Sequence, residues 1–414
     1  MSEPILTHTL KNGLVLLGEP MEGVESAAFS IRVPAGTAYE PEEYAGLSTM
    51  SCELALRGAG DRDSRQFVTD LDNLGVERDA NVSDAHTGFS GATLARNLFP
   101  ALSIYADVLR RPRLPADQVS ASRAVVLHEL SSIEDDPAQK VMLELRRRHF
   151  PSPWGRPSQG REESVEAIEL TQIKEHVKRH YRPNGAIISV AGRFDWNAVR
   201  DHIAGLYEDW SEQPATEPTL GKSGTRIEHL EQESNQTQIG IAYSSVPYRD
   251  PDYFQAWGSV GVLSGGMSCR LFTEVREKRG LCYSVYASHQ SLRDRAAVLC
   301  YAGTSAERAQ ETLDVTLGEL IRLSKGIETE ELSRLKARIK SGLVMQQEST
   351  SARSAAIARD WYYLGRVRTL DEVAALVDGL SRDSINAFLS EHPPQDFTIV
   401  TLGPKPLEVP VGVS

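Results

Sequence analysis

A segment in the second half of the chain, residues 265–285, predicts a helix followed directly by a strand. It reads GGMSCRLFTEVREKRGLCYSV. Ser268 follows two glycines in the position of an N-cap, the apolar residues after it repeat at helical spacing, and Gly280 is typical of a helix end. We therefore expect a helix over residues 268–278 and a strand over residues 281–287.

The same segment places a guanidinium and a phenol seven residues apart. Arg276 lies near the end of the predicted helix and Tyr283 at the start of the strand, so both side chains could reach one cavity. Together these groups can bind a carbonyl oxygen or an oxyanion. Taken singly, each has a plainer interpretation, because Arg276 lies in a charged run typical of a solvated helix face and Tyr283 could be a half-buried strand residue.

The sequence of this segment resembles that of the second domain in the pitrilysin/insulinase family of zinc metallopeptidases. Residues 182–192 are also similar to that family. In the family an arginine and a tyrosine at this spacing contact the substrate, which implies that role for Arg276 and Tyr283. The resemblance covers nearly the whole chain. It implies the clam-type metallopeptidase fold, which is α+β with two homologous domains, each a mainly antiparallel sheet covered by helices.

The organisation of the chain agrees with two domains. Its 414 residues are long for one core and sufficient for two domains of about 200 residues. Residues 213–225 are rich in proline, glycine and polar residues and predict a linker between a domain at 1–212 and a domain at 226–414. Both parts run from hairpin-connected strands to grouped helices and back to a strand, which predicts an α+β sheet covered by helices on one face.

The metal motif of the resembled family is altered in this sequence. There, the first helix carries His-x-x-Glu-His, whose histidines bind zinc while the glutamate activates water. The run that corresponds here is residues 46–59, GLSTMSCELALRGA. Thr49 and Glu53 stand where the two histidines would be, and Cys52 stands where the glutamate would be. The third ligand is matched by Glu129, 76 residues beyond Glu53, so we expect a degenerate zinc motif and no metal in this chain.

Two other sets of side chains could hold a metal. The first set is Cys52, Glu53, His128 and Glu129. Its ligand types suit a metal, but neighbouring helix residues point about 100° apart, so His128 and Glu129 rarely reach one ion. The second is the i, i+4 pair His176 and His180, which lacks the internal glutamate of a protease motif and also suits the negative end of a helix dipole.

Composition excludes several classes of protein. The net charge of −12 and the lack of a basic stripe argue against a nucleic-acid surface. No apolar run reaches the roughly 18 residues of a membrane span, so we expect no membrane association. The start, Met1-Ser2-Glu3-Pro4, lacks the pattern of a secretory or transit sequence, and four cysteines without paired spacing suggest reduced thiols, so we expect a cytoplasmic protein.

Three functions remain open. In the first, the chain is the zinc-less subunit of a heteromeric metalloendopeptidase that acts on unfolded peptides, and it supplies Arg276 and Tyr283 to the zinc site of a homologous zinc-bearing partner. A self-dimer is the other assembly that stays open. The chain would then be inactive alone, with the zinc in its partner. In the second, it is a non-catalytic structural or assembly subunit of the same fold. In the third, it is a lone peptidase with an aberrant metal site.

Overall fold

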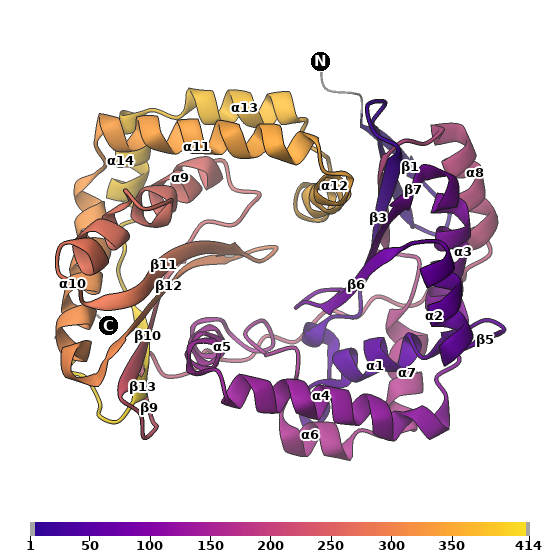
Figure 1. Cartoon of the computed structure of the whole chain (residues 1–414), viewed down its shortest axis with the longest axis horizontal. Coiled ribbons are helices and arrows are strands. Elements are labelled where there is room, and N and C mark those ends of the chain that lie inside the picture. Colours follow the sequence, from indigo (N-terminus) through magenta and orange to yellow (C-terminus); the bar gives the residue numbers. More distant parts are fainter. Residues whose placement is uncertain (1–4, 411–414) are drawn as a thin grey trace. The chain divides into compact units, whose positions relative to one another are not determined.

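The computed structural model describes residues 5–410, and the chain divides into two compact units (Figure 1). Unit 1 consists of Met1–Ser132, Arg156–Leu220 and Val344–Thr369. Unit 2 consists of Ile133–Gly155, Gly221–Leu343 and Leu370–Ser414. The first four residues, used above to argue for a cytoplasmic location, lie outside the described residues.

The sheet of unit 1 has six strands in the order β1-β2-β8-β3-β7-β6. Their bounds are β1 Leu6–Thr9, β2 Val15–Pro20, β3 Ser26–Val33, β6 Glu77–Val82, β7 Thr87–Leu94 and β8 Ile187–Gly192. All neighbours are antiparallel except β2 and β8. Strands β1 and β2 form a hairpin around the Asn12-Gly13 turn that the sequence predicts, and Gly13 has a φ of 80° there, a conformation that glycine adopts without strain.

Helices cover one face of this sheet and enclose the main core of unit 1. The helices of the unit are α1 Leu47–Ala55, α2 Ser64–Asn73, α3 Leu98–Arg110, α4 Val119–Glu134, α6 Glu162–Ala167, α7 Leu170–His180, α8 Trp196–Tyr207 and α12 Thr350–Leu364, with a small ribbon of β4 Gly58–Ala59 and β5 Arg62–Asp63. From the strands, Phe29 and Ile31 are fully buried in this core. Leu47, Met50 and Leu54 of α1 are buried in it, as their helical spacing predicts.

The sheet of unit 2 repeats this topology in the order β11-β12-β10-β13-β9. Its strands are β9 Ile227–Glu231, β10 Gln236–Ser245, β11 Cys282–Ser291, β12 Ala296–Ser305 and β13 Thr398–Gly403. Only β9 and β13 are parallel, as are β2 and β8 in unit 1. The helices are α5 Pro137–His149, α9 Tyr253–Ser264, α10 Ala309–Arg322, α11 Thr329–Gln347, α13 Leu370–Gly379 and α14 Arg382–Glu391. Two units of one topology confirm the duplication and the α+β class.

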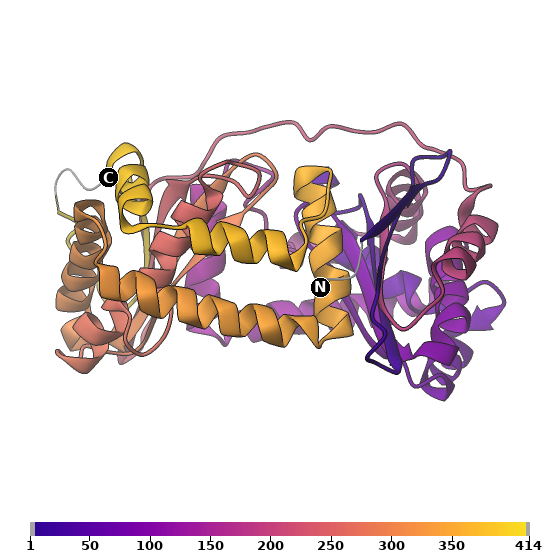
Figure 2. The same cartoon turned by 90° about the horizontal axis from the view of Figure 1, so that it is seen from above.

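Each sheet also carries one helix on its other face, which corrects the prediction of helices on one face only. In unit 1 this helix is α12, which packs on β3 and β8 although it comes from the second half of the chain (Figures 1 and 2). In unit 2 it is α5, from the first half, which packs on β10 and β13. Sequence periodicity predicts both helices but cannot say which sheet each one covers.

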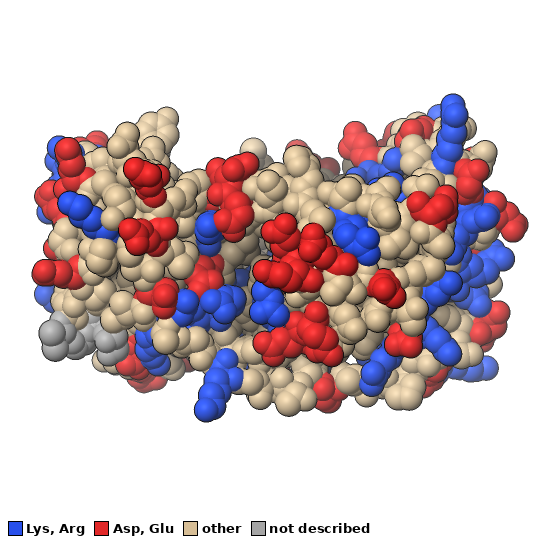
Figure 3. Space-filling model, turned by 90° about the horizontal axis from the view of Figure 1, so that it is seen from below, with Lys and Arg blue, Asp and Glu red and all other residues tan. Residues whose placement is uncertain are grey.

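The surface mixes charges of both signs. On the face shown in Figure 3, lysines and arginines alternate with aspartates and glutamates and form no continuous basic stripe. Among the helices at residues 5–410, none combines the length and the apolar character that a bilayer span requires.

Candidate functional site

Helix α1, which carries the altered metal motif, is fixed at its start by a buried carboxylate. Gly46 precedes the helix with a φ of 99°. The Glu40 carboxylate accepts hydrogen bonds from the backbone N–H groups of Gly46 at 3.0 Å and Ser48 at 2.6 Å. Burial raises the pKa of Glu40 to about 7, while these hydrogen bonds act in the opposite direction. The Glu40 carboxyl therefore satisfies two backbone N–H groups that have no partner within the helix.

A loop over residues 156–160 packs tightly against this helix. Gly160 has a φ of 76°, and a Cβ atom there would lie 2.0 Å from the carbonyl oxygen of Ala45, so only glycine fits. The hydroxyl of Thr49 donates to the carbonyl oxygen of Ser158 at 2.5 Å. Thr49 stands where the family has its first histidine, and here it ties the loop to the helix.

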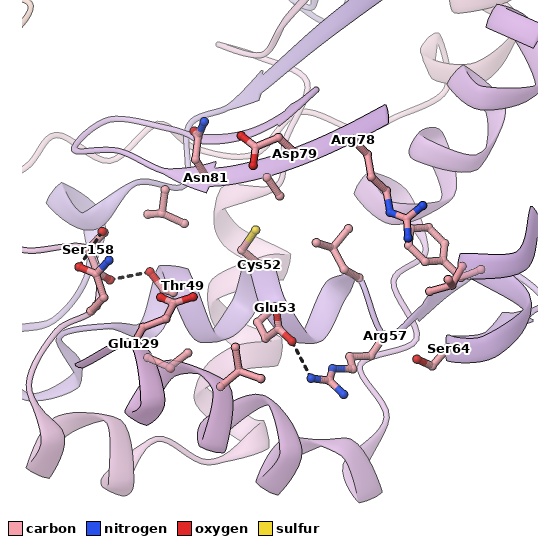
Figure 4. Close-up of a pocket in the computed structure, with 18 of the residues that line it drawn as sticks. Thr49, Cys52, Glu53, Arg57, Ser64, Arg78, Asp79, Asn81, Glu129 and Ser158 are labelled. Carbon is pink, nitrogen blue, oxygen red and sulfur yellow. Dashed lines mark hydrogen bonds and ion pairs between the residues drawn. The ribbon is translucent and has the colours of Figure 1, made fainter. Parts of the chain in front are cut away.

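The four predicted positions of the metal motif line one cavity in unit 1 of about 640 Å³ (Figure 4). They are Thr49, Cys52, Glu53 and Glu129. The Cys52 side chain rises from α1 toward β6, whose Asp79 and Asn81 are on the opposite wall. Charged groups from β6 and from the end of α1, Arg78 and Arg57, also line the cavity. The fold thus brings together four positions that are separated by up to 80 residues in the sequence.

The chemistry of these groups differs from that of a metal site. Burial, followed by the negative charges of Glu53, Asp79 and Glu129, raises the pKa of Cys52 to about 12, so its thiol is protonated near neutral pH. Glu53 accepts a hydrogen bond from Arg57 at 2.6 Å and forms an ion pair with it. Burial and the charge of Glu53 raise the pKa of Glu129.

This donor set does not fit zinc. Zinc binds thiolates, neutral imidazoles and carboxylates, usually in a tetrahedral arrangement. Here Thr49 donates its proton to a loop carbonyl, Cys52 keeps its proton, and Glu53 is held by Arg57. Across residues 5–410, no three His, Cys, Asp or Glu side chains gather closely enough to hold a metal ion.

The other histidines considered from the sequence have structural surroundings. His128 is exposed and is not among the residues that line the cavity. His176 and His180 are buried side by side, with ring centroids 4.7 Å apart, and His176 Nε2 lies 3.3 Å from the Ser48 hydroxyl. Burial lowers the pKa of His176 to about 3 and that of His180 to about 4. Both are therefore neutral parts of the packing behind α1.

The second predicted site lies in unit 2, where Arg276 and Tyr283 are in contact. The Cζ atom of Arg276 is 5.2 Å from the ring centroid of Tyr283. Two backbone irregularities produce this arrangement. Phe272–Glu277 is π-helical instead of the expected helix over 268–278, and the ladder of β11 shifts register between Cys282 and Ser284, so Tyr283 stands at a bulge. Irregularities of both kinds are frequent at functional sites.

In the described part of the chain, no carboxylate forms an ion pair with the guanidinium of Arg276. The nearby Glu274 instead binds Lys278 at 2.7 Å and Arg279 at 2.8 Å. Among residues 5–410, no hydrogen bond or ion pair is made by the side chain of Arg276. Its donors are free for a ligand, and its contacts are aromatic rings.

Both side chains of the pair are exposed within unit 2, and the prediction that both could reach one cavity stays a prediction. Arg276 is exposed, and Tyr283 is 85% exposed. The bulge at Tyr283 causes this, because a residue outside the ladder register is turned out of the sheet.

Some residues of the two sites were not predicted. In unit 1 these are Arg78 and Asp79 of β6, which no motif marks and which only the sheet brings to the cavity. In unit 2 it is Phe272, whose ring centroid lies 4.9 Å from Arg276 Cζ. Its i, i+4 spacing from Arg276 was a usable signal, since residues four apart lie on one side of a helix.

Comparisons of sequence agree with the resemblance. A profile described as insulinase (peptidase family M16) matches residues 19–152, and one described as peptidase M16 inactive domain matches residues 167–339. A Bacillus subtilis (strain 168) protein named as an uncharacterized zinc protease is 26% identical over 409 residues, which are 97% of this chain and 98% of that protein. A Mycobacterium bovis protein of the same description is 27% identical over 96% of this chain and 92% of its own length.

Solved structures share the fold at low sequence identity. A peptidase M16 inactive domain from Pseudomonas fluorescens has a TM-score of 0.90 and 21% identity, covering 98% of this chain and 99% of that one. A protease from Helicobacter pylori has a TM-score of 0.89 and 20% identity, covering 98% and 100%. A chain of complex III2 from Candida albicans has a TM-score of 0.84 and 20% identity, covering 97% and 96%.

Proposed function

Because this chain belongs to the insulinase family of peptidases, peptidase family M16, we propose that it is the zinc-less subunit of a two-chain metalloendopeptidase. It supplies Arg276 and Tyr283, while a homologous partner supplies the zinc. The observation that carries the proposal is the contact between these two side chains at an exposed surface, where no carboxylate of residues 5–410 pairs with the guanidinium.

The altered motif in unit 1 supports this division of roles. The side chains at the metal positions are held by Ser158 and Arg57 or kept protonated by burial, so this chain cannot activate water by the chemistry of its relatives. Hydrolysis therefore requires a metal held elsewhere. We place that metal in a partner chain that is a zinc-bearing homologue.

Arg276 and Tyr283 have the chemistry to stabilise a tetrahedral intermediate. The guanidinium and the phenol hydroxyl both donate hydrogen bonds, and donors aimed at a developing oxyanion are worth about 2.7 to 4 kcal/mol each. The stacked guanidinium is already oriented, so little reorganisation accompanies the reaction. In the proposed complex they bind the carbonyl oxygen of the scissile peptide and then the oxyanion.

An unfolded peptide is the substrate that suits this surface. Tyr283 lies on β11, which is an edge strand of the sheet of unit 2. An edge strand has free backbone N–H and C=O groups, to which an extended peptide can add as a further strand. A folded substrate has few extended segments free for such pairing.

The proposal is tested by assaying cleavage of an unfolded peptide with this chain alone, with a zinc-bearing homologue alone, and with both. We expect activity only in the mixture. Arg276→Ala or Tyr283→Phe should lower kcat about 10²- to 10³-fold, as removal of an oxyanion donor does. Arg322→Ala, which removes a surface arginine paired with Glu319, is the matched control and should leave kcat unchanged. Equal activity of the Arg276 variant and the parent would refute the proposal.

A second candidate function is a structural subunit of an assembly. The similarity of fold to a chain of complex III2 favours it. A scaffold would form a stable complex with its partner, and Arg276→Ala would alter neither the complex nor any activity. The third possibility, a lone peptidase, requires about one zinc per purified chain and activity without a partner, which metal analysis and the single-chain assay decide.

A further inference from the structure

We propose that Phe272 is a positioning residue that holds the Arg276 guanidinium in its oriented state before a ligand arrives. This inference rests on the proposed function, since it assigns the group that orients one of the two donors. Phe272 itself has no polar atom and does not donate to the substrate. Its role is to act on Arg276.

The guanidinium of Arg276 contacts two aromatic rings. Arg276 Cζ lies 4.9 Å from the centroid of Phe272 and 5.2 Å from that of Tyr283. Both distances are within the range of about 6 Å at which a ring face attracts a cation. A guanidinium stacked on a ring is restricted in rotation, while the N–H groups at its rim stay free.

Packing of the core does not account for Phe272. The same π-helical segment buries Val275 completely, and Leu271 just before it is equally buried, so these two join the hydrophobic core of unit 2. In the described part of the chain, Phe272 is not among the residues of that core or of the layer packed against it, and it is half-buried. The contact with Arg276 therefore accounts for the position of this ring better than packing of the core does.

The rings of Phe272 and Tyr283 have different roles in the proposed site. Tyr283 is 85% exposed at a bulge, and its hydroxyl is the proposed second donor, so its ring must adjust to the substrate. Phe272 lies on the same segment as Arg276, one turn earlier, and moves with it. The fixed ring is therefore Phe272, and it keeps the guanidinium oriented when Tyr283 shifts.

The first experiment measures the stack directly in the full-length chain alone. Phenylglyoxal modifies accessible guanidinium groups, and mass spectrometry gives the rate at Arg276 relative to Arg322 in the same sample. Phe272→Leu should raise this relative rate about two- to fivefold, the factor that an exposed cation–π contact supplies. Phe272→Tyr should keep the parent rate. Phe388→Leu, which removes a buried ring stacked on His392, is the control for general loss of stability and should leave the rate unchanged.

The second experiment uses the mixture with a zinc-bearing homologue. Phe272→Leu should lower kcat two- to fivefold with KM unchanged, and Phe272→Tyr should restore it, because orientation of the donor matters most in the transition state. An unchanged labelling rate in Phe272→Leu overturns the stacking of Phe272 on Arg276, and faster labelling with unchanged kcat overturns the positioning role. If the parent mixture is inactive, the proposed function fails, and the labelling result still decides whether the ring holds the guanidinium.

Discussion

Single side chains decide what each site of this chain can do. Arg276 and Tyr283 stay free for a ligand because a π-helical segment and a bulge turn them out of regular structure. Thr49 and Glu53, in contrast, are occupied by Ser158 and Arg57. The proposed oxyanion donors and the altered metal motif therefore depend on different side chains.

A prediction at the same scale concerns how stability depends on pH through Glu40. Burial raises the pKa of its carboxyl from 4.5 to about 7. The folded-state value lies above the unfolded one, so this group's contribution to the free energy of unfolding is fully present below about pH 4.5 and is lost as the pH rises to about 7. The loss amounts to about 3 kcal/mol. Glu40→Gln has no such titration, so its stability relative to the parent should rise by about this amount between pH 4.5 and pH 8.

The measurement is urea unfolding of both proteins at a series of pH values. The buried histidines His176 and His180 titrate in both proteins and largely cancel in the difference. Exposed Glu43→Gln is the control and should run parallel to the parent. A Glu40→Gln profile that also runs parallel would show that the carboxyl does not titrate in this window.

At the scale of elements, α12 is held on the sheet of unit 1 by a buried ion pair. Arg353 of α12 donates to both oxygens of Glu19 in β2 at 2.7 to 2.9 Å, and the two side chains are 5% and 9% exposed. A bidentate pair fixes the register of the helix as well as its contact. The partners are 334 residues apart in sequence, so the pair also joins distant parts of the chain.

Removal of one partner of this pair should be strongly destabilising. Arg353→Met leaves the Glu19 carboxylate buried without a counter-charge, which costs about 3 to 5 kcal/mol of unfolding free energy. Adding Glu19→Leu should recover most of the loss, since two apolar groups leave no buried charge. Arg322→Met, at an exposed pair, should cost less than about 1 kcal/mol. Denaturant unfolding compares them, and equal losses at both arginines would contradict the account.

At the scale of the whole molecule, the two halves of the chain exchange a helix. Unit 1 takes α12 from the second half, and unit 2 takes α5 from the first. In each unit the helix covers an apolar surface: Leu17 and Ile187 lie under α12, and Val400 and Leu402 lie under α5. Neither half of the sequence alone can therefore cover both faces of its own sheet.

This exchange predicts the behaviour of a divided chain. Residues 210–225 contain no helix or strand, so a cut within 213–225 should leave two fragments that co-elute in gel filtration and unfold together. Fragments 1–212 and 226–414 made separately should bind a hydrophobic dye and lack a cooperative transition, and mixing them should restore it. Two independently folded fragments would show instead that the exchanged helices are dispensable.

The sequence by itself determined the class of fold, most helices, the first hairpin and the residue types at the positions of the altered metal motif. These features depend on local patterns: turn residues at Asn12 and Gly13, the apolar stripe of α1, and residue types at fixed spacing. A short strand such as β9, whose side chains are only half-buried, carries too weak a pattern to be predicted.

Only the tertiary structure decided where α5 and α12 pack, what occupies the side chains of the altered motif, and how Arg276 is held. The bond from Thr49 to Ser158 and the pair of Glu19 with Arg353 join residues that no local pattern connects. The bulge at Tyr283 lies where β11 begins to pair with β12, a few residues after the π-helical segment. Contacts of this kind follow from packing of the whole unit, so the sequence read locally cannot supply them.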